Sequence, residues 1–200
     1  MLFSVLKMDA GPILRQLKYP LKGHEKSTDL LQTLFRLGAL ELVSALPSVF
    51  DGTATTVQQD DSLATPAPKL STNESYLDLS LLSARECHNR CRAFSGWPGT
   101  WTFFRIGSDD SLVRVKVVTT CIIDGDRRSS NTSNKVSLVK HEGVDVLRVE
   151  CGDGSLLGVS EVQPAGKKEM SVKAYVNGLR GADLFWSVAH SPSSSSVDHK

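Results

Sequence analysis

The stretch S-A-R-E-C-H-N-R-C-R-A-F-S-G-W-P-G-T-W-T-F-F, residues 83–104, predicts a short capped helix, a tight turn and the start of a strand. Ser83 and Glu86 have the spacing at which each side chain can bond the other residue's backbone N–H at a helix start. The helix should end near residue 95, because Gly96 favours a C-cap and Pro98 cannot continue the hydrogen-bond ladder. The aromatic and β-branched residues that follow are typical of a strand. These residues therefore open a domain.

The composition of the chain is that of a folded protein. It has 200 residues, of which 40% are hydrophobic and 22% charged, which suffices for one or two hydrophobic cores. We find no apolar run that approaches the roughly 20 residues needed to cross a bilayer. The first residues also lack the basic region and long apolar core of a signal peptide, and a transit peptide is missing. The sequence therefore predicts no membrane association.

Charge is unevenly distributed along the chain. Residues 1–84 hold 7 Lys and Arg against 9 Asp and Glu, a net charge of −2. Residues 85–180 hold 15 Lys and Arg against 11 Asp and Glu, a net charge of +4. A surplus of positive charge in one domain is a modest indication of a polyanionic partner, although many solvated protein surfaces carry as much.

The four cysteines predict thiols rather than a metal site or a disulfide framework. Cys87, His88 and Cys91 share a spacing found among zinc ligands, but no second Cys/His pair with ligand spacing follows in the sequence. Four cysteines in 200 residues are also too few for a disulfide scaffold. We therefore expect buried or half-buried thiols and no metal.

The first fifty residues carry the patterns of two strands and of one long helix or two abutting helices. Residues 2–6 and 13–17 are apolar enough to form strands on either side of a tight loop. Ser27 or Thr28 can cap the helix, whose apolar stripe is wide. We interpret this stripe as a surface that faces a core. Because two strands are not stable alone, the chain is expected to begin inside a domain.

The remainder of the chain predicts a linker, a barrel and a final helix. Residues 51–68 are rich in Thr, Asp, Gln, Ala and Pro without a hydrophobic period, which is typical of a surface linker. Five short apolar segments separated by turn residues then favour a small antiparallel barrel of the OB type or a sandwich. These segments are residues 101–106, 112–123, 136–140, 144–151 and 156–162. Ser171 can cap a helix that stops at Gly178, and residues 187–200 form a Ser-rich tail.

Four motifs occur in the order in which one protein family carries them. They are M-D-A-G-P-I-L at residues 8–14, A-P-K-L at 67–70, R-A-F-S-G-W-P-G-T at 92–100 and Q-P-A-G-K-K-E-M at 163–170. The last is the most specific, because eight adjacent matching residues are hard to reach by chance. The chain therefore resembles the C-terminal half of the methionyl-tRNA formyltransferases. These enzymes transfer a formyl group from 10-formyltetrahydrofolate to the amino group of methionine on initiator tRNA.

The resemblance implies a fold class and a division into domains. The fold class is an α/β remnant of a Rossmann-like formyltransferase domain followed by an all-β OB-fold-like C-terminal barrel. The implied domains are the end of the catalytic domain at residues 1–50, a linker at 51–82, a tRNA-binding barrel at 83–186 and a disordered tail at 187–200. The linker and the barrel agree with the patterns described above.

The resemblance also implies one catalytic residue. Asp9, in the loop Asp9-Ala10-Gly11, matches the family's aspartate that orients a catalytic histidine and a water molecule, whereas the sequence alone favours a loop aspartate that bonds its own backbone. The family's Asn-x-His pair and Ser-Leu-Leu-Pro folate loop do not occur in this sequence. We therefore expect a truncated member or an incomplete gene product that is inactive alone, because formyl transfer needs a stabilised oxyanion and a proton acceptor.

Cations within the matched motifs are implied to contact tRNA phosphates. They are Lys69, Arg92, Lys167 and Lys168. Lysine and arginine neutralise the nucleic-acid backbone and release counterions, although each of these residues could equally be a solvated surface cation. Trp97 and Trp101 could stack on bases, but packing against the barrel is the preferred interpretation for both.

The resemblance further implies the partners and the location of the protein. It implies initiator methionyl-tRNA as partner, 10-formyltetrahydrofolate as formyl donor, a monomer, and a mitochondrial location as in eukaryotic organellar members, with a bacterial-type cytoplasm as the alternative. Two other functions stay open: a non-catalytic RNA-binding OB module and a related folate-dependent formyl hydrolase. The motif at residues 163–170 argues against the hydrolase, because it is more typical of the tRNA enzyme.

Overall fold

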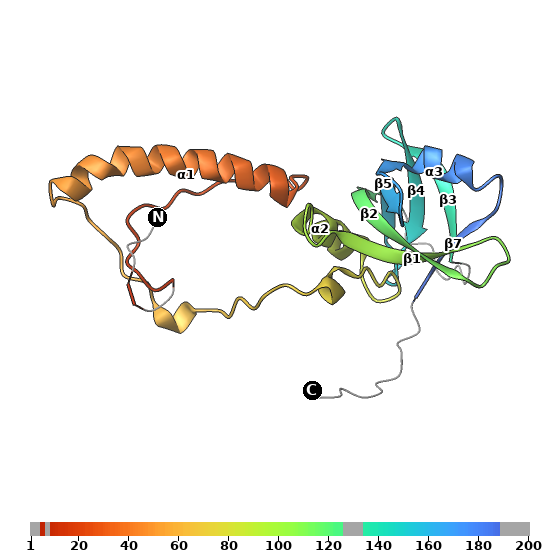
Figure 1. Cartoon of the computed structure of the whole chain (residues 1–200), viewed down its shortest axis with the longest axis horizontal. Coiled ribbons are helices and arrows are strands. Elements are labelled where there is room, and N and C mark those ends of the chain that lie inside the picture. The colour runs from red at the N-terminus through yellow and green to blue at the C-terminus, as the bar shows by residue number, and fades with distance from the viewer. Residues whose placement is uncertain (1–4, 7–8, 126–133, 189–200) are drawn as a thin grey trace. The chain divides into compact units, whose positions relative to one another are not determined.

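A computed structural model of the protein describes residues 5–6, 9–125 and 134–188. The chain forms two compact units, Met1–Leu70 and Ser71–Lys200. The division falls inside the segment predicted to be a linker, because residues 71–82 belong to the second unit. All strands of the described chain lie in the second unit (Figure 1).

The main element of the first unit is helix α1, Ser27–Phe50. Lys26 occupies the N-cap position, and its own side chain makes no cap hydrogen bond. The prediction that Ser27 or Thr28 caps the helix is therefore wrong. The helix continues through Pro47, whose missing N–H removes one hydrogen bond without ending the helix.

The apolar stripe of α1 is not covered by other residues of the described unit. Ala45 is the one residue of the helix that is buried. Seven large apolar side chains of α1 are exposed by more than 40%: Leu31, Leu34, Phe35, Leu40, Leu42, Val43 and Phe50. The structure thus leaves exposed the stripe that the sequence predicted to face a core.

By length and composition alone, α1 could cross a membrane. Its most apolar window has a mean hydropathy of 1.4, and 6% of that window is buried. This finding corrects the expectation that no apolar run of sufficient length occurs. Core helices of soluble proteins and signal sequences meet the same criterion, so the helix alone does not place the chain in a membrane.

Outside α1, the described residues of the first unit have little regular structure. Ile13 and Val57 form a single antiparallel bridge, in which each N–H donates to the other residue's carbonyl at 2.8 and 2.9 Å. The predicted strand at residues 13–17 is therefore wrong, because the bridge pairs only one of its residues. A 3-10 turn, η1, follows at Asp61–Leu63. The predicted strand at residues 2–6 lies mostly outside the described residues.

The second unit contains a closed antiparallel barrel of six strands (Figure 1). The strands are β1 (Thr100–Ile106), β2 (Leu112–Ile123), β3 (Lys135–His141), β4 (Val144–Glu150), β5 (Leu156–Pro164) and β7 (Leu184–Ser187). They pair in the ring order β1, β2, β5, β4, β3, β7 and back to β1. The five predicted strands are confirmed to within two residues at each end, whereas β7 was not predicted.

Alternating side chains fill the barrel. On β1, Thr102 and Phe104 point inward and are 1% and 0% exposed, and Val115 on β2 is fully buried beside them. Leu147 on β4 and Val159 on β5 complete this layer at 1% and 2% exposure. Burying a large apolar side chain contributes about 1.5–3 kcal/mol, so this core is the main source of the unit's stability.

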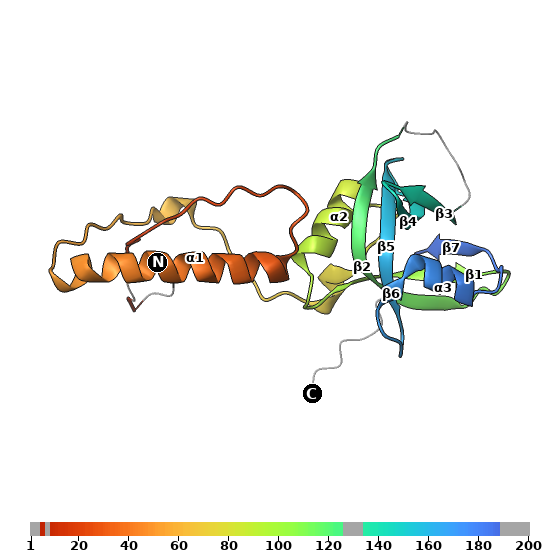
Figure 2. The ribbon, with the colours of Figure 1, turned by 90° about the horizontal axis from the view of Figure 1, so that it is seen from above.

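Helix α2, Ala84–Ala93, packs beside β2 (Figure 2). The predicted capping box is confirmed, since the Glu86 N–H donates to Ser83 Oγ (3.2 Å) and the Ser83 N–H donates to Glu86 Oε2 (2.8 Å). The buried face of the helix consists of Ala84, Cys87 and Cys91, which belong to the barrel core.

Residues 71–82 are packed into the barrel unit and do not form a free linker. They begin with the 3-10 turn η2, Thr72–Ser75. Leu77 and Leu79 beyond it are 0% and 2% exposed. The Gly152 N–H donates to the Leu79 carbonyl (2.8 Å), and a Cβ at Gly152 would lie 1.8 Å from the Ser80 carbonyl oxygen. Only glycine permits this close approach of two backbones.

The last elements are a two-residue strand, a helix and β7. Strand β6 (Met170–Ser171) pairs with β5, and Ser171 Oγ accepts a bond from the Ala174 N–H (3.3 Å), which confirms the predicted cap of helix α3, Val172–Gly178. Strand β7 then closes the barrel and includes Ser187, where the tail was predicted to start. Residues 189–200 of the predicted tail lie outside the described residues.

A fragment of residues 71–188 should fold on its own as a β-rich domain. It retains Leu77, Leu79 and β7, which fill and close the barrel. The smaller fragment of residues 85–180 spans every strand predicted from the sequence but lacks these groups, so it should unfold without cooperativity. Thermal melts followed by circular dichroism test this difference, and equal stability of the two fragments would contradict it.

Candidate functional site

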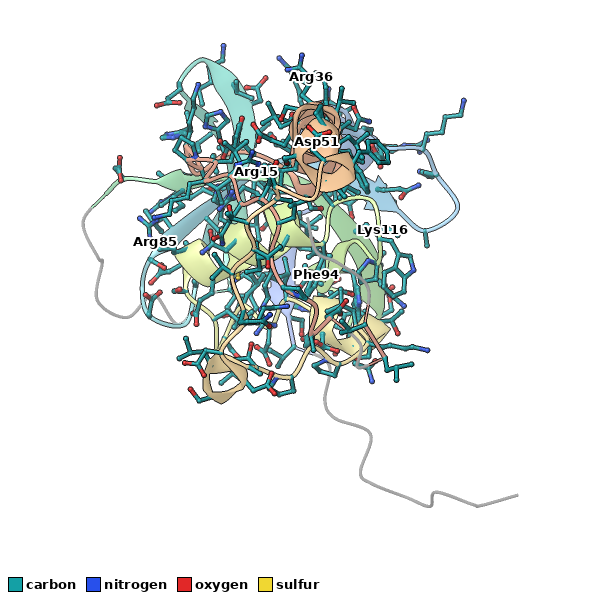
Figure 3. The ribbon with its side chains drawn as sticks, turned by 90° about the vertical axis from the view of Figure 1, so that its left-hand side faces the viewer. Arg15, Arg36, Asp51, Arg85, Phe94 and Lys116 are labelled. Atoms are coloured by element: carbon teal, nitrogen blue, oxygen red, sulfur yellow. The ribbon has the colours of Figure 1, made fainter. Side chains whose placement is uncertain are left out.

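The outer face of β1 and β2 carries aromatic and basic side chains. Strand alternation turns Trp101 and Phe103 outward on β1, because Thr102 between them is buried. The same alternation turns Arg114 and Lys116 outward on β2, and both are exposed. Lys116, which is labelled in Figure 3, is an exposed residue of β2.

Strand register aligns four of the outer residues in one row. Tyr76 forms a parallel bridge with Trp101, Trp101 pairs with Lys116, and Lys116 pairs with Gln163 on β5. Directly paired residues on one face of a sheet have neighbouring side chains. The row therefore consists of two aromatic side chains, a lysine and an amide, in this order.

A tight turn follows β5 at the end of this row. The Lys167 N–H donates to the Pro164 carbonyl (3.1 Å), and Gly166 has a φ of +71°. This left-handed conformation favours glycine. Gln163 Nε2, at the end of β5, donates to the Lys167 carbonyl (3.0 Å), and this hydrogen bond stabilises the turn. The predicted motif at residues 163–170 thus forms a defined turn that presents Lys167 and Lys168 to solvent.

A hollow of about 420 Å³ lies between the turn and β2. Its lining, which we call the basic pocket, consists of Arg114, Lys116, Gln163, Pro164, Ala165 and Gly166. Lys167 and Lys168 directly follow its last residue and are exposed. The pocket and its rim thus bring four cations together on one side of the barrel.

These four cations form no ion pair with the described carboxylates. The ion pairs of the described barrel unit involve other cations: Arg105 with Asp110 (3.8 Å), Lys135 with Asp183 (2.8 Å) and Lys173 with Asp145 (3.3 Å). No described carboxylate pairs with the four cations of the pocket and its rim. Cations gathered without counter-charges attract an external anion.

An aromatic cluster adjoins the basic pocket. We define it as Tyr76, Trp101 and Phe103. The ring of Trp101 lies 4.7 Å from that of Tyr76 and 5.4 Å from that of Phe103, measured between centroids. The Arg114 guanidinium carbon lies 4.0 Å from the centroid of the Trp101 ring, within the range of a cation–π contact. Arg114 thus links the cluster to the pocket.

The predicted tRNA-binding cations lie on different elements of the chain. Lys167 and Lys168 lie beside the basic pocket. Arg92 lies on the last turn of α2, where its Nη2 donates to Asn89 Oδ1 (2.8 Å). Lys69 is exposed and belongs to the first unit. Their contact with tRNA stays a prediction.

Arg114 and Lys116 are site residues that the sequence prediction missed. They occupy alternate positions of a strand that was predicted with correct ends, so the period of two already assigned them to its outer face. What the sequence did not show is that β5 pairs with β2 and brings the turn of residues 163–167 next to them.

Asp9 lies in the first unit, and its side chain is exposed. Its φ of 55° is in the left-handed region, which aspartate tolerates better than most residues. Gln59 Nε2 donates to the carbonyl oxygens of Asp9 (2.7 Å) and Gly11 (2.8 Å), so the backbone of the loop is fixed. The catalytic role of Asp9 stays a prediction.

The candidate zinc ligands do not converge. Cys87 and Cys91 face the core, while His88 Nδ1 lies 2.9 Å from Thr120 Oγ1. A hydrogen bond with Cys87 and burial raise the pKa of Cys151, which keeps this thiol protonated. Among the described residues, no three metal-binding side chains gather in one place.

The two tryptophans of the predicted stacking site differ in environment. Trp97 is 64% exposed in the turn after α2, whereas Trp101 is only partly exposed within the aromatic cluster. Trp101 packs against Tyr76 and Phe103 on the outer face of the barrel, while most of Trp97 is in contact with solvent.

Comparisons with known proteins identify relatives of the chain. The family model described as formyl transferase, C-terminal domain, matches residues 69–180. A methionyl-tRNA formyltransferase of Staphylococcus epidermidis is 30% identical over 179 residues, which cover 90% of this chain and 54% of the relative. A methionyl-tRNA formyltransferase of Lactobacillus johnsonii is 33% identical over 174 residues, which cover 87% and 51%. The chain spans about half the length of these curated relatives.

A solved structure supports the fold. The crystal structure of a HypX variant from Aquifex aeolicus superposes with a TM-score of 0.62 at 12% sequence identity. The match covers 90% of this chain and 31% of the HypX chain. At this identity the likeness concerns the fold alone.

Replacing Gly166 with alanine should destabilise the barrel unit by about 1–2 kcal/mol, because a Cβ disfavours the left-handed conformation. Gly166→Asn should cost less, since asparagine visits this region more readily. Gly178→Ala is the matched control, because Gly178 has an ordinary φ and open space around its Cα. Urea unfolding measures all three changes. A loss for Gly178→Ala as large as that for Gly166→Ala would contradict the role of the turn.

Proposed function

Because this chain belongs to the formyl transferase C-terminal domain family, as its resemblance to the methionyl-tRNA formyltransferases predicted, we propose that its barrel unit binds tRNA. The tRNA would be initiator methionyl-tRNA, the substrate that receives the formyl group in protein synthesis initiation. The observation that carries this proposal is the basic pocket, whose cations have no counter-charges in the described structure. The names of the relatives support the choice of tRNA among polyanions.

The basic pocket suits the phosphates of a nucleic-acid backbone. Arg114 and Lys116 project from one strand, and Lys167 and Lys168 follow the turn opposite them. Their charges can neutralise neighbouring phosphates and release condensed counterions, which is the main source of affinity in sequence-independent binding. Because phosphate contacts carry no sequence information, this surface would position the tRNA rather than select it.

The proposal extends to the finer fold assignment. The barrel would be an OB-fold-like module, a fold that often binds nucleic acids on its outer strands. The first unit would be the end of a Rossmann-like catalytic domain, in which the exposed stripe of α1 packs against a sheet. The monomeric state, the independence from membranes and the mitochondrial location are proposed from the family resemblance.

The proposed reaction is formyl transfer from 10-formyltetrahydrofolate. Attack by the methionine amino group creates a developing oxyanion and releases a proton, so the active site needs hydrogen-bond donors and a proton acceptor. Asp9 would orient these groups, because its loop backbone is fixed by Gln59 while its carboxylate remains exposed. The second candidate function is a non-catalytic RNA-binding module, which the basic pocket by itself would support.

Replacing Lys167 and Lys168 together with alanine should weaken tRNA binding and flatten its salt dependence. If each lysine contacts one phosphate, the slope of log affinity against log salt should fall by roughly two units. Gel-shift titrations at several salt concentrations measure the slope. The matched control is Lys135→Ala with Lys173→Ala, which removes the same charge from lysines that are ion-paired. Equal losses in the two double variants would contradict the proposed surface.

The chain on its own should not formylate methionyl-tRNA at a measurable rate. Loss of a single oxyanion donor typically lowers the rate by a hundredfold or more, and the family's catalytic pair does not occur in this sequence. Assays with purified protein, 10-formyltetrahydrofolate and initiator methionyl-tRNA test this expectation. Turnover above background would show that other residues carry the chemistry.

A further inference from the structure

We propose that Trp101 and Arg114 form a stacking platform for one unpaired RNA base, beside the phosphates held by the basic pocket. This inference rests on the proposed function and deepens it. It assigns to the barrel a partner that has an unpaired nucleotide, at a loop or at an end, rather than an uninterrupted duplex.

The position of Arg114 is the first observation behind this proposal. Its direct register partner on β1 is Phe103, yet its guanidinium carbon lies over the ring of Trp101, 4.0 Å from the centroid. The side chain therefore reaches diagonally along the sheet, which long side chains can do between neighbouring strands. This diagonal brings the guanidinium to the row that contains Lys116.

The ring of Trp101 is held in place before any ligand arrives. Its Nε1 donates to the Thr72 carbonyl (3.4 Å), and its own carbonyl accepts a bond from the Leu77 N–H (2.8 Å). Tyr76 and Phe103 contact two sides of the ring at centroid distances of 4.7 and 5.4 Å. A fixed ring loses little entropy on binding, so a ligand that stacks on this platform gains affinity.

The chemistry of the pair suits a nucleobase. The arginine guanidinium is planar, and nucleobases stack on guanidinium planes as well as on aromatic rings. A base inside a duplex already stacks on its neighbours, so only an unpaired base can use the platform. Lys116 pairs with Trp101 across the strands and with Gln163 beyond, so a cation and an amide lie next to the platform. These groups can contact the phosphates on either side of the base.

The barrel offers a matched control with the same chemistry. Arg105 lies over the ring of Phe185, 4.5 Å from its centroid. However, Arg105 also donates to the Gly107 carbonyl (3.3 Å) and pairs with Asp110 (3.8 Å). It does not line the basic pocket. A lysine at either position keeps the charge and removes the planar group.

The test compares RNA oligonucleotides that differ only in their bases. The full chain is titrated with a single-stranded RNA of about eight nucleotides, a typical site size for such surfaces, and with an abasic strand of equal length. The wild-type protein should prefer the strand with bases by about fivefold to a hundredfold, the range expected for one stacked base.

Two substitutions decide whether the platform is responsible. Arg114→Lys should abolish the preference for bases and leave the affinity for the abasic strand unchanged, because the charge is kept. Arg105→Lys should change neither quantity. The proposal is overturned if the wild-type protein binds both strands equally, or if the two variants lose the preference to the same extent.

The outcomes also separate this proposal from the proposed function. If the abasic strand binds with a steep salt dependence but bases add nothing, the platform is wrong and the phosphate-binding surface stands. If neither strand binds in a salt-dependent manner, the proposed function itself fails.

Discussion

Closure of the barrel depends on one long strand that pairs on both of its edges. Strand β2 has 12 residues, of which Leu112–Val117 pair with β1 and Val115–Ile123 pair with β5. The register of β2 against β5 shifts between Val117 and Thr120, where a bulge or irregularity bends the strand while it stays paired with β5. Arg114 and Lys116 lie just before this bend. The same constraint that closes the core therefore places the two cations between the aromatic cluster and the turn after β5.

Local patterns predicted most of the barrel unit. The capping box at Ser83, the alternation in β2 and the cap at Ser171 are interactions between residues that are close in sequence, and the structure confirms them. Strand β7 has only four residues, and it was not predicted because so short an apolar segment next to a Ser-rich tail has no clear period.

Pairings between distant residues could not be predicted from sequence. Whether β5 pairs with β2 is decided by closure of the whole barrel, and this pairing creates the basic pocket. In the same way, residues 71–82 have the composition of a linker, but Leu77 and Leu79 are buried in the barrel core. Gly152 has no side chain and therefore allows the backbone of this segment to approach. The apolar stripe of α1 was predicted to be buried but is exposed in the structure. A periodic pattern predicts a buried face of a helix, but it does not specify which residues cover that face.

The short strand β7 has a consequence for assembly. It pairs with β1 on one edge and with β3 on the other, so four residues cover two sheet edges at once. When β7 detaches, the backbone groups of both edges become open to strand addition. A neighbouring copy can supply its own β7 to this gap, because the missing element is identical and the sequence that connects it to α3 is a short turn. The segment that completes the monomer is thus also the element through which two copies could exchange strands.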